Sequence, residues 1–115
     1  MTDETLFTKI INGAIPCDKV YEDEHTFAFR DINPGAPVHV LVVPKKPIAR
    51  LTDAEPADAE LLGRLLLTAN KVAQMEGIAE SGFRCVVNTN QDAGQTVWHL
   101  HVHVLGGRAL QWPPG

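Results

Sequence analysis

Three histidines alternate with apolar residues in the stretch His99-Leu100-His101-Val102-His103-Val104, close to the C-terminal end of the 115-residue sequence. An extended strand directs successive side chains to opposite faces of its sheet. The stretch therefore predicts a strand with three imidazole rings on one face and Leu100, Val102 and Val104 packed on the other. Packing alone gives little reason for such a row, whereas imidazole acts as nucleophile, acid, base or metal ligand near neutral pH. We expect a chemical role for it.

The remaining elements are short and closely spaced. Apolar patterning and turn residues predict a short helix over 5–12, strands over 18–22, 26–31, 38–43 and 82–88, a long helix from Pro56 to Gly77, and the histidine strand over 97–105. A core-facing stripe of the long helix is expected from its apolar residues at helical spacing: Leu61, Leu62, Leu65, Leu66, Ala69, Val72 and Ala73.

Strands joined by short turns usually pair antiparallel, whereas parallel pairing needs longer crossovers. We therefore expect a single α+β domain over residues 1–115, with a five-stranded antiparallel sheet and the long helix packed on one face. The other face is left for the histidines.

Composition narrows the classes of partner and compartment. The formal net charge is −4, which disfavours non-specific attraction to nucleic acid or to an anionic membrane. The sequence begins with Met-Thr-Asp-Glu-Thr and has no long apolar run, so we expect neither a secretory signal nor a membrane span. Cys17 and Cys85 lack the spacing of a metal or redox motif, which favours free thiols in a reducing, cytoplasmic compartment.

Three interpretations of the histidine row compete: a structural row without a task, a metal site and phosphate chemistry. At about 3.3 Å per residue, His99 and His103 lie about 13 Å apart, too far for one zinc ion to bind both comfortably. His101 with one neighbour and His39 is a more feasible ligand set. A neutral imidazole is also a competent nucleophile at phosphorus. The loop over 88–96 is rich in neutral hydrogen-bonding groups, as a phosphate site requires, which favours this third interpretation.

The histidine row, with Gly94-Gln95-Thr96 before it and Leu105-Gly106-Gly107 after it, resembles the histidine triad family of nucleotide-binding proteins. The similarity covers essentially the whole chain. It includes Phe7-x-x-Ile10-Ile11-x-Gly-x-Ile15-Pro16, Phe29-Arg30-Asp31-Ile32-Asn33-Pro34 and the run from Pro37 to Lys46. The ending, with Gly107-Arg108 followed by Trp112-Pro113-Pro114-Gly115, is similar to the purine nucleoside phosphoramidase branch.

The resemblance implies a homodimer with one continuous sheet, and hydrolysis of adenosine or guanosine 5′-phosphoramidates without a required cofactor. It implies that His101 attacks the α-phosphorus, His103 binds the phosphate oxygens, His99 orients His101 and His39 supports the row. Asp31 would hold the ribose hydroxyls. The base would be surrounded by apolar side chains: Phe7, Ile10, Ile15, Phe29, Ile32 and Leu41. The phosphate-loop positions would be Asn88, Gln95 and Thr96.

Several alternatives stay open. Thr96 stands where serine is common in the family, which puts leaving-group specificity in question, and Trp98 stands where tyrosine is common, which changes the bulk beside the site. Trp112 fits either local packing or a reach across the dimer to the partner's site. The alternative functions are hydrolysis of dinucleoside polyphosphates, and a zinc- or nucleotide-binding interaction module with weak catalysis. The sequence does not reveal the amine released or the preferred purine.

Overall fold

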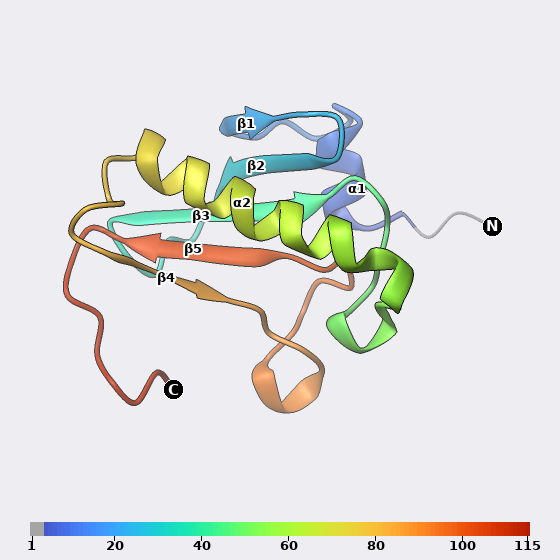
Figure 1. The fold of residues 1–115 in the computed structure, drawn as a ribbon. Coiled ribbons are helices and arrows are strands. Elements are labelled where there is room, and N and C mark those ends of the chain that lie inside the picture. Colours follow the sequence, from blue (N-terminus) through green and yellow to red (C-terminus); the bar gives the residue numbers. More distant parts are fainter. Residues whose placement is uncertain (1–3) are drawn as a thin grey trace.

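Five antiparallel strands form one sheet in the computed structural model, which describes residues 4–115 (Figure 1). The strands are β1 (Lys19–Glu22), β2 (Thr26–Arg30), β3 (Val38–Pro44), β4 (Phe83–Val86) and β5 (Val102–Gly106). They lie in the order β1-β2-β3-β5-β4, and every neighbouring pair runs antiparallel. The predicted α+β architecture is confirmed.

The long helix α2 (Ala59–Met75) covers one face of the sheet (Figure 1). It follows two 3₁₀ turns, Leu51–Asp53 and Pro56–Asp58, so the predicted start at Pro56 is a 3₁₀ turn and the α-helix begins three residues later. Its buried stripe consists of Leu65, Thr68, Ala69, Val72 and Ala73. The expectation for Leu66 is wrong: its neighbour Leu65 occupies the centre of the stripe, and Leu66, one step around the helix, is 57% exposed.

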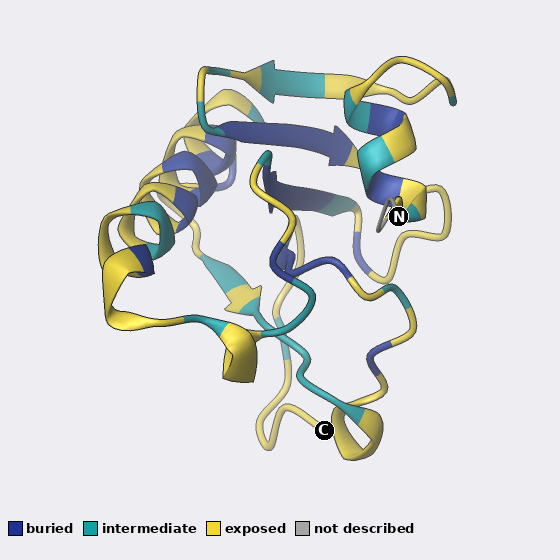
Figure 2. Cartoon of the chain, turned by 90° about the vertical axis from the view of Figure 1, so that its right-hand side faces the viewer, coloured by how far each residue is buried: buried dark blue, intermediate teal, exposed yellow. Residues whose placement is uncertain are grey.

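The opposite face of the sheet carries the short helix α1 (Leu6–Ile11) and a second apolar cluster. Alternation along β3 divides its side chains between the two faces: Val40 and Val42 pack in the α2 cluster, and Leu41 and Val43 in the α1 cluster. Figure 2 shows the buried strands β2 and β3 lying between the two helices. Within residues 4–115, no helix has the length and apolar character needed to cross a bilayer.

The histidine strand is shorter than predicted, because β5 begins at Val102 rather than near residue 97. Its ladder with β3 ends at the pair Val42–Val102. Before that pair, the chain turns to another partner, and the Leu100 N–H donates to the carbonyl of Ile48 at 2.7 Å. Pro44 and Pro47 lack the N–H groups with which β3 would extend the ladder. His99 and His101 therefore lie in an extended approach to β5.

The alternation of side chains along 99–104 holds despite the shorter strand. Leu100, Val102 and Val104 belong to the buried α2 cluster. The His101 ring contacts Phe7 of the α1 cluster, with ring centroids 5.0 Å apart, and the His99 ring lies 6.0 Å from Phe7. The predicted division between an apolar face and an imidazole face is confirmed.

Gly106 and Gly63 provide a matched pair for testing how tightly β5 packs. A Cβ at Gly106 would lie 2.6 Å from Cδ1 of Ile78, whereas one at Gly63 would meet nothing within 4 Å on the exposed side of α2. We expect Gly106→Ala to lower the free energy of unfolding by about 1–3 kcal/mol. Gly63→Ala should raise it by about 0.5–1 kcal/mol. Urea denaturation measures both, and equal stability of the two variants would contradict this packing.

Candidate active site

Four histidines meet at the α1 face of the sheet, three from the row and one from the neighbouring strand β3. The rings of His101 and His103 have centroids 4.9 Å apart, and those of His39 and His103 are 5.1 Å apart. His39 reaches His103 because β3 pairs with β5, where His39 stands opposite Leu105 and Leu41 opposite His103. The sheet register thus brings His39 to the histidine row, although His39 and His103 are 64 positions apart in the sequence.

A hollow of about 350 Å³ opens in front of these rings. It is lined by most of the residues predicted to bind nucleotide: Phe7, Ile10, Ile15, Phe29, Asp31, Ile32, Leu41, Thr96, His101 and His103. Apolar groups line the part formed by α1, β2 and β3, and the histidines stand beside them. The hollow therefore combines an apolar compartment with an imidazole-rich one, as a nucleotide requires.

Hydrogen bonds fix which nitrogen of His101 is free. Its Nδ1 lies 2.7 Å from the carbonyl oxygen of His99, and a carbonyl only accepts, so Nδ1 carries the proton. Nε2 of the neutral ring then holds a lone pair. Within residues 4–115 this Nε2 has no hydrogen-bond partner. The contact is the one through which we expect His99 to orient His101, and the role itself stays a prediction.

A second chain of hydrogen bonds fixes His103. The Gly35 N–H donates to Nδ1 of His39 at 2.9 Å, so the proton of the neutral His39 ring is on Nε2. That Nε2 lies 2.9 Å from Nδ1 of His103, which therefore accepts and leaves its own proton on Nε2. Asn88 lies 3.4 Å from this nitrogen, and a half turn of its carboxamide presents oxygen to the N–H. His103 thus offers a donor beside the free nitrogen of His101.

Burial keeps all four rings neutral at physiological pH. It lowers the pKa of His39, His99 and His101 below the ordinary value of 6.5. For His103, burial and the neighbouring His101 and His39 lower the pKa to about 4. A neutral His101 is the form that attacks phosphorus.

These lowered pKa values predict acid sensitivity of folding. Below pH 6.5 the unfolded chain binds protons at its histidines that the folded chain does not bind. The free energy of unfolding should therefore fall as pH decreases from 6.5 towards about 4. Urea denaturation at about pH 7.5 and about pH 5 measures the loss. His103→Asn should reduce the pH dependence, because it removes the ring with the most strongly lowered pKa.

The other predicted site residues occupy different positions. Ile32 is 90% exposed at the rim of the hollow. Asp31 accepts the Asn33 N–H through Oδ1, and its Oδ2 lies 3.5 Å from Nε2 of His39. The Gln95 side chain is buried and bonded to the backbone at Ala49, Asn90 and Val97, so it shapes the loop. Trp112 is 79% exposed and stacks near Arg84, outside the hollow.

Sequence reasoning missed some lining residues and one contact of the row. Leu6, Pro16, Cys17 and Val97 also line the hollow. Thr5, just before α1, contacts the ring of His99 through its hydroxyl at 3.1 Å. A threonine that precedes an apolar helical run is a recognisable helix cap, but the pattern gives no sign of a contact 94 residues away.

Asp31, His39 and His103 offer ligand atoms within 4.8 Å of one another, a set suited to a cation such as zinc. The set contains His39 and His103, a neighbour of His101, as expected, but Asp31 takes the place of His101. A cation there would have to displace the hydrogen bond between His39 and His103. The expectation that catalysis requires no metal stays a prediction.

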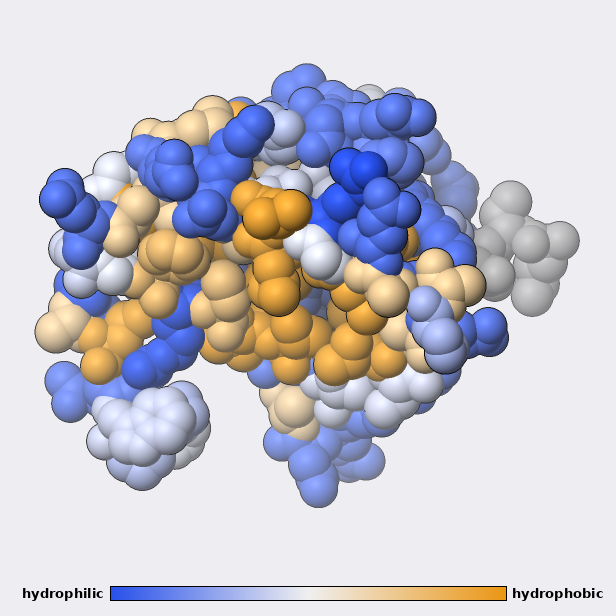
Figure 3. All heavy atoms as spheres, in the orientation of Figure 1, coloured by the Kyte–Doolittle hydropathy of each residue, from blue (hydrophilic) through white to orange (hydrophobic). Residues whose placement is uncertain are grey.

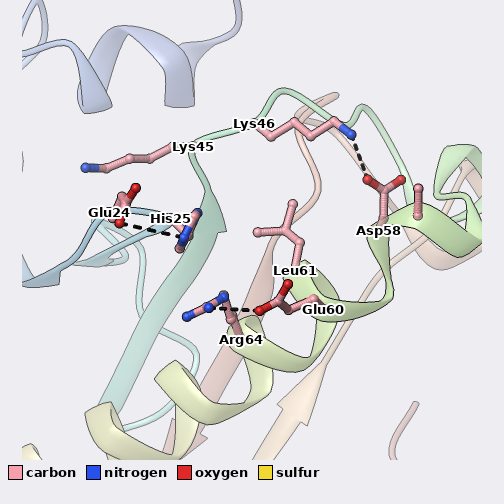
Figure 4. A pocket seen from close by; sticks show the side chains of 9 residues that line it. Glu24, His25, Lys45, Lys46, Asp58, Glu60, Leu61 and Arg64 are labelled. Carbon is pink, nitrogen blue, oxygen red and sulfur yellow. Dashed lines mark hydrogen bonds and ion pairs between the residues drawn. The ribbon is translucent and has the colours of Figure 1, made fainter.

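A second hollow, of about 340 Å³, shares no lining residue with the first. Figure 4 shows two ion pairs among the side chains that line it: Lys46 lies 2.7 Å from Asp58, and Arg64 lies 2.9 Å from Glu60. Paired charges of both signs give this hollow no preference for a phosphate. The histidine-lined hollow is the better candidate.

Comparisons with known proteins identify the family of the chain. Residues 12–110 match the model of the HIT domain. The purine nucleoside phosphoramidase of Escherichia coli is 48% identical over 110 residues, covering 96% of this chain and 92% of that protein. An uncharacterized HIT-like protein of Synechococcus elongatus is 56% identical over the full length of both chains.

Solved structures with the same fold include a HIT family hydrolase from Legionella pneumophila, with a TM-score of 0.95 and 51% identity over 97% of this chain and 100% of that one. A histidine triad protein from Clostridium difficile has a TM-score of 0.92 and 42% identity over 96% of each chain. With its own histidine row on the imidazole face of the sheet, this chain belongs to the HIT, or histidine triad, family.

Proposed function

We propose that this protein hydrolyses purine nucleoside 5′-phosphoramidates to the nucleoside monophosphate and an amine, through a nucleotidyl group carried on His101. The observation that carries the proposal is that Nε2 of His101, at the hollow, has no hydrogen-bond partner among residues 4–115 and lies beside the Nε2–H of His103. The 48% identical E. coli relative named purine nucleoside phosphoramidase supports the same conclusion.

The proposed reaction has two displacements at phosphorus. Nε2 of His101 forms a bond to the α-phosphorus while the P–N bond breaks, and the amine leaves with a proton. His103 donates its Nε2–H to a phosphoryl oxygen and so stabilises the charge that develops there. Thr96 lines the hollow, where its hydroxyl is available to pass a proton to the amine. Water then attacks the phosphorus as the bond to His101 breaks; the proton that water loses returns to Thr96, and the nucleoside monophosphate is released.

Cleavage of an amine-linked AMP, with a metal chelator present, tests the proposal. We expect AMP and free amine as products, and faster turnover than with diadenosine tri- or tetraphosphate. Preferential cleavage of the polyphosphates would favour the alternative hydrolase. Stoichiometric zinc together with chelator-sensitive nucleotide binding and no turnover would favour the interaction module.

Asp31 provides a prediction about the sugar. Its carboxylate lines the hollow and is suited to accept hydrogen bonds from both ribose hydroxyls. We expect Asp31→Asn to raise KM for the ribonucleotide substrate about tenfold, because a hydrogen bond to a charged group contributes about 1.5–3 kcal/mol. The preference for ribose over 2′-deoxyribose should fall with it. Asp18→Asn, which removes an exposed carboxylate paired with Arg30, is the matched control.

The proposed homodimer is supported by the edge strand β4 and by the apolar surface of α2. Figure 3 shows apolar side chains gathered over α2 and the strands beneath it. Leu66, Leu67 and Met75 are each more than half exposed. Light scattering measures the mass in solution and so tests for the dimer. If the protein is a dimer, reduced turnover of Trp112→Ala would indicate that Trp112 reaches the partner's site. A cytoplasmic location stays a prediction.

A further inference from the structure

We propose that Thr5 is a positioning residue, whose hydroxyl holds the buried His99 ring in a single neutral tautomer and ties helix α1 to the histidine row. The inference rests on the proposed function, because the purpose assigned to His99 is to support His101 during nucleotidyl transfer. Thr5 lies outside the histidine row and does not line the hollow.

Two acceptors lie within reach of the Thr5 hydroxyl proton, Nδ1 of His99 at 3.1 Å and the Thr8 hydroxyl oxygen at 3.5 Å. Its oxygen accepts the Thr8 N–H at 3.2 Å, and the Thr8 hydroxyl both accepts the Thr5 N–H at 2.6 Å and donates to the Thr5 carbonyl at 2.8 Å. The Thr8 oxygen thus already accepts one hydrogen bond, and it is the more distant of the two acceptors. The shorter contact directs the Thr5 proton at Nδ1 of His99.

The other nitrogen of His99 completes the tautomer. Its Nε2 lies 2.8 Å from the carbonyl oxygen of Pro44, which only accepts, so Nε2 carries the proton and Nδ1 must accept. A hydroxyl donor at Nδ1 matches that requirement, and the ring is 0% exposed. Both ring nitrogens are satisfied without a charge.

A neutral His99 ring matters because His101 becomes cationic once its Nε2 bonds to phosphorus. The carbonyl of His99 receives the Nδ1–H of His101 at 2.7 Å, so any movement of residue 99 displaces the nucleophile. His101 is the titratable group that acts on His99 among the described residues, and like charges on the two rings would oppose each other. Burial lowers the pKa of His99. A hydroxyl donor at Nδ1 likewise favours the neutral ring, because it bonds to the unprotonated nitrogen.

The same threonine connects the histidine row to the wall of the hollow. Thr5 caps α1, and Phe7 and Ile10 of that helix line the hollow. The Phe7 ring contacts His101, at 5.0 Å between centroids. Thr5 therefore sets the position of α1 and the state of His99 through one side chain.

Three substitutions separate helix capping from hydrogen-bond donation to His99. Thr5→Ser keeps both, Thr5→Asp keeps an excellent cap but has no proton to donate when ionised, and Thr5→Val removes both. In Thr5→Asp, the carboxylate favours a proton on Nδ1 of His99 and so raises the pKa of that ring.

We expect Thr5→Ser to retain wild-type kcat. Thr5→Asp should keep the wild-type melting temperature and AMP affinity but lose about tenfold in kcat, the effect of about 1.4 kcal/mol. The acid limb of its kcat profile should move to higher pH. Thr5→Val should lose kcat and also melt at a lower temperature.

Nitrogen-15 NMR of the imidazole rings reads the same property without turnover. Wild-type protein should show His99 protonated on Nε2 alone, and Thr5→Asp should show protonation of Nδ1 at a higher pH. Wild-type kcat, pH profile and ring spectrum in Thr5→Asp would overturn the inference. Failure of the wild-type protein to cleave phosphoramidates would instead defeat the proposed function, and the ring spectra would still decide the role of Thr5.

Discussion

Replacing His101 with alanine is expected to lower kcat for an amine-linked AMP by roughly 10⁴-fold or more, the scale of loss when a covalent nucleophile is removed. The physical reason is that the neutral Nε2 of His101 lies at the hollow without a hydrogen-bond partner in the described part of the chain. No described neighbour can replace it, because His103 directs its proton, not its lone pair, towards the same space. Steady-state release of AMP measures the loss.

Trapping distinguishes a nucleophile from a residue that only binds. Acid quench of the wild-type protein during turnover should leave AMP covalently attached, and peptide mapping should place it at residue 101. His101→Ala should bind AMP but carry none covalently. The half-buried His25, which lines the other hollow, supplies the control, since His25→Ala should turn over normally. A labelled peptide in His101→Ala, or unchanged turnover, would contradict the mechanism.

Removing His103 is the second large effect. His103→Ala should lower kcat/KM by about 10²–10³-fold, because a donor aimed at developing charge in a buried site is worth about 3–4 kcal/mol. His39 acts through His103, to which it is hydrogen-bonded at 2.9 Å, so His39→Ala should cost less than His103→Ala. The double variant should be little worse than His103→Ala alone, since the two residues work in series.

The pH dependence of kcat/KM separates this role from simple folding. Both His101 and His103 have lowered pKa values, that of His103 at about 4, so the activity profile should stay flat through neutral pH and fall only as His101 protonates at acid pH. His103→Gln, which keeps a donor, should recover part of the loss in His103→Ala.

Additive losses in the double variant of His39 and His103, or a loss for His39→Ala that exceeds that for His103→Ala, would show that His39 acts independently.

The fold was largely predictable because its signals are local. Alternation along 99–104 divides the residues between two faces without knowledge of the partners, and the spacing of Leu65, Ala69 and Val72 identifies the helix that covers one face. The early end of the ladder at Val102 was not predictable, because it depends on where residues 44–48 leave β3 and present the Ile48 carbonyl.

The site was predictable where residue type and position in a sequence pattern indicate a chemical role. The imidazole row and the apolar residues of the hollow came from pattern and family resemblance, and the structure brings ten of the predicted residues to one hollow. The tautomers of His39, His99 and His101 could not be predicted, because backbone groups of Gly35, Pro44 and His99 fix them. Gln95 is a polar residue in the loop predicted to bind phosphate, but its side-chain amide donates to the backbone carbonyls of Ala49 and Val97. Residue type alone does not predict these backbone contacts.

The division of 99–104 between two faces has a consequence for how this protein can change over time. Its reaction chemistry and its folding use odd and even positions of one short segment. A single inserted or deleted residue within that segment would exchange the two sets, placing imidazoles under α2 and aliphatic groups in the hollow. Point substitutions are therefore the open route for divergence here, whereas length changes are confined to the loops on either side.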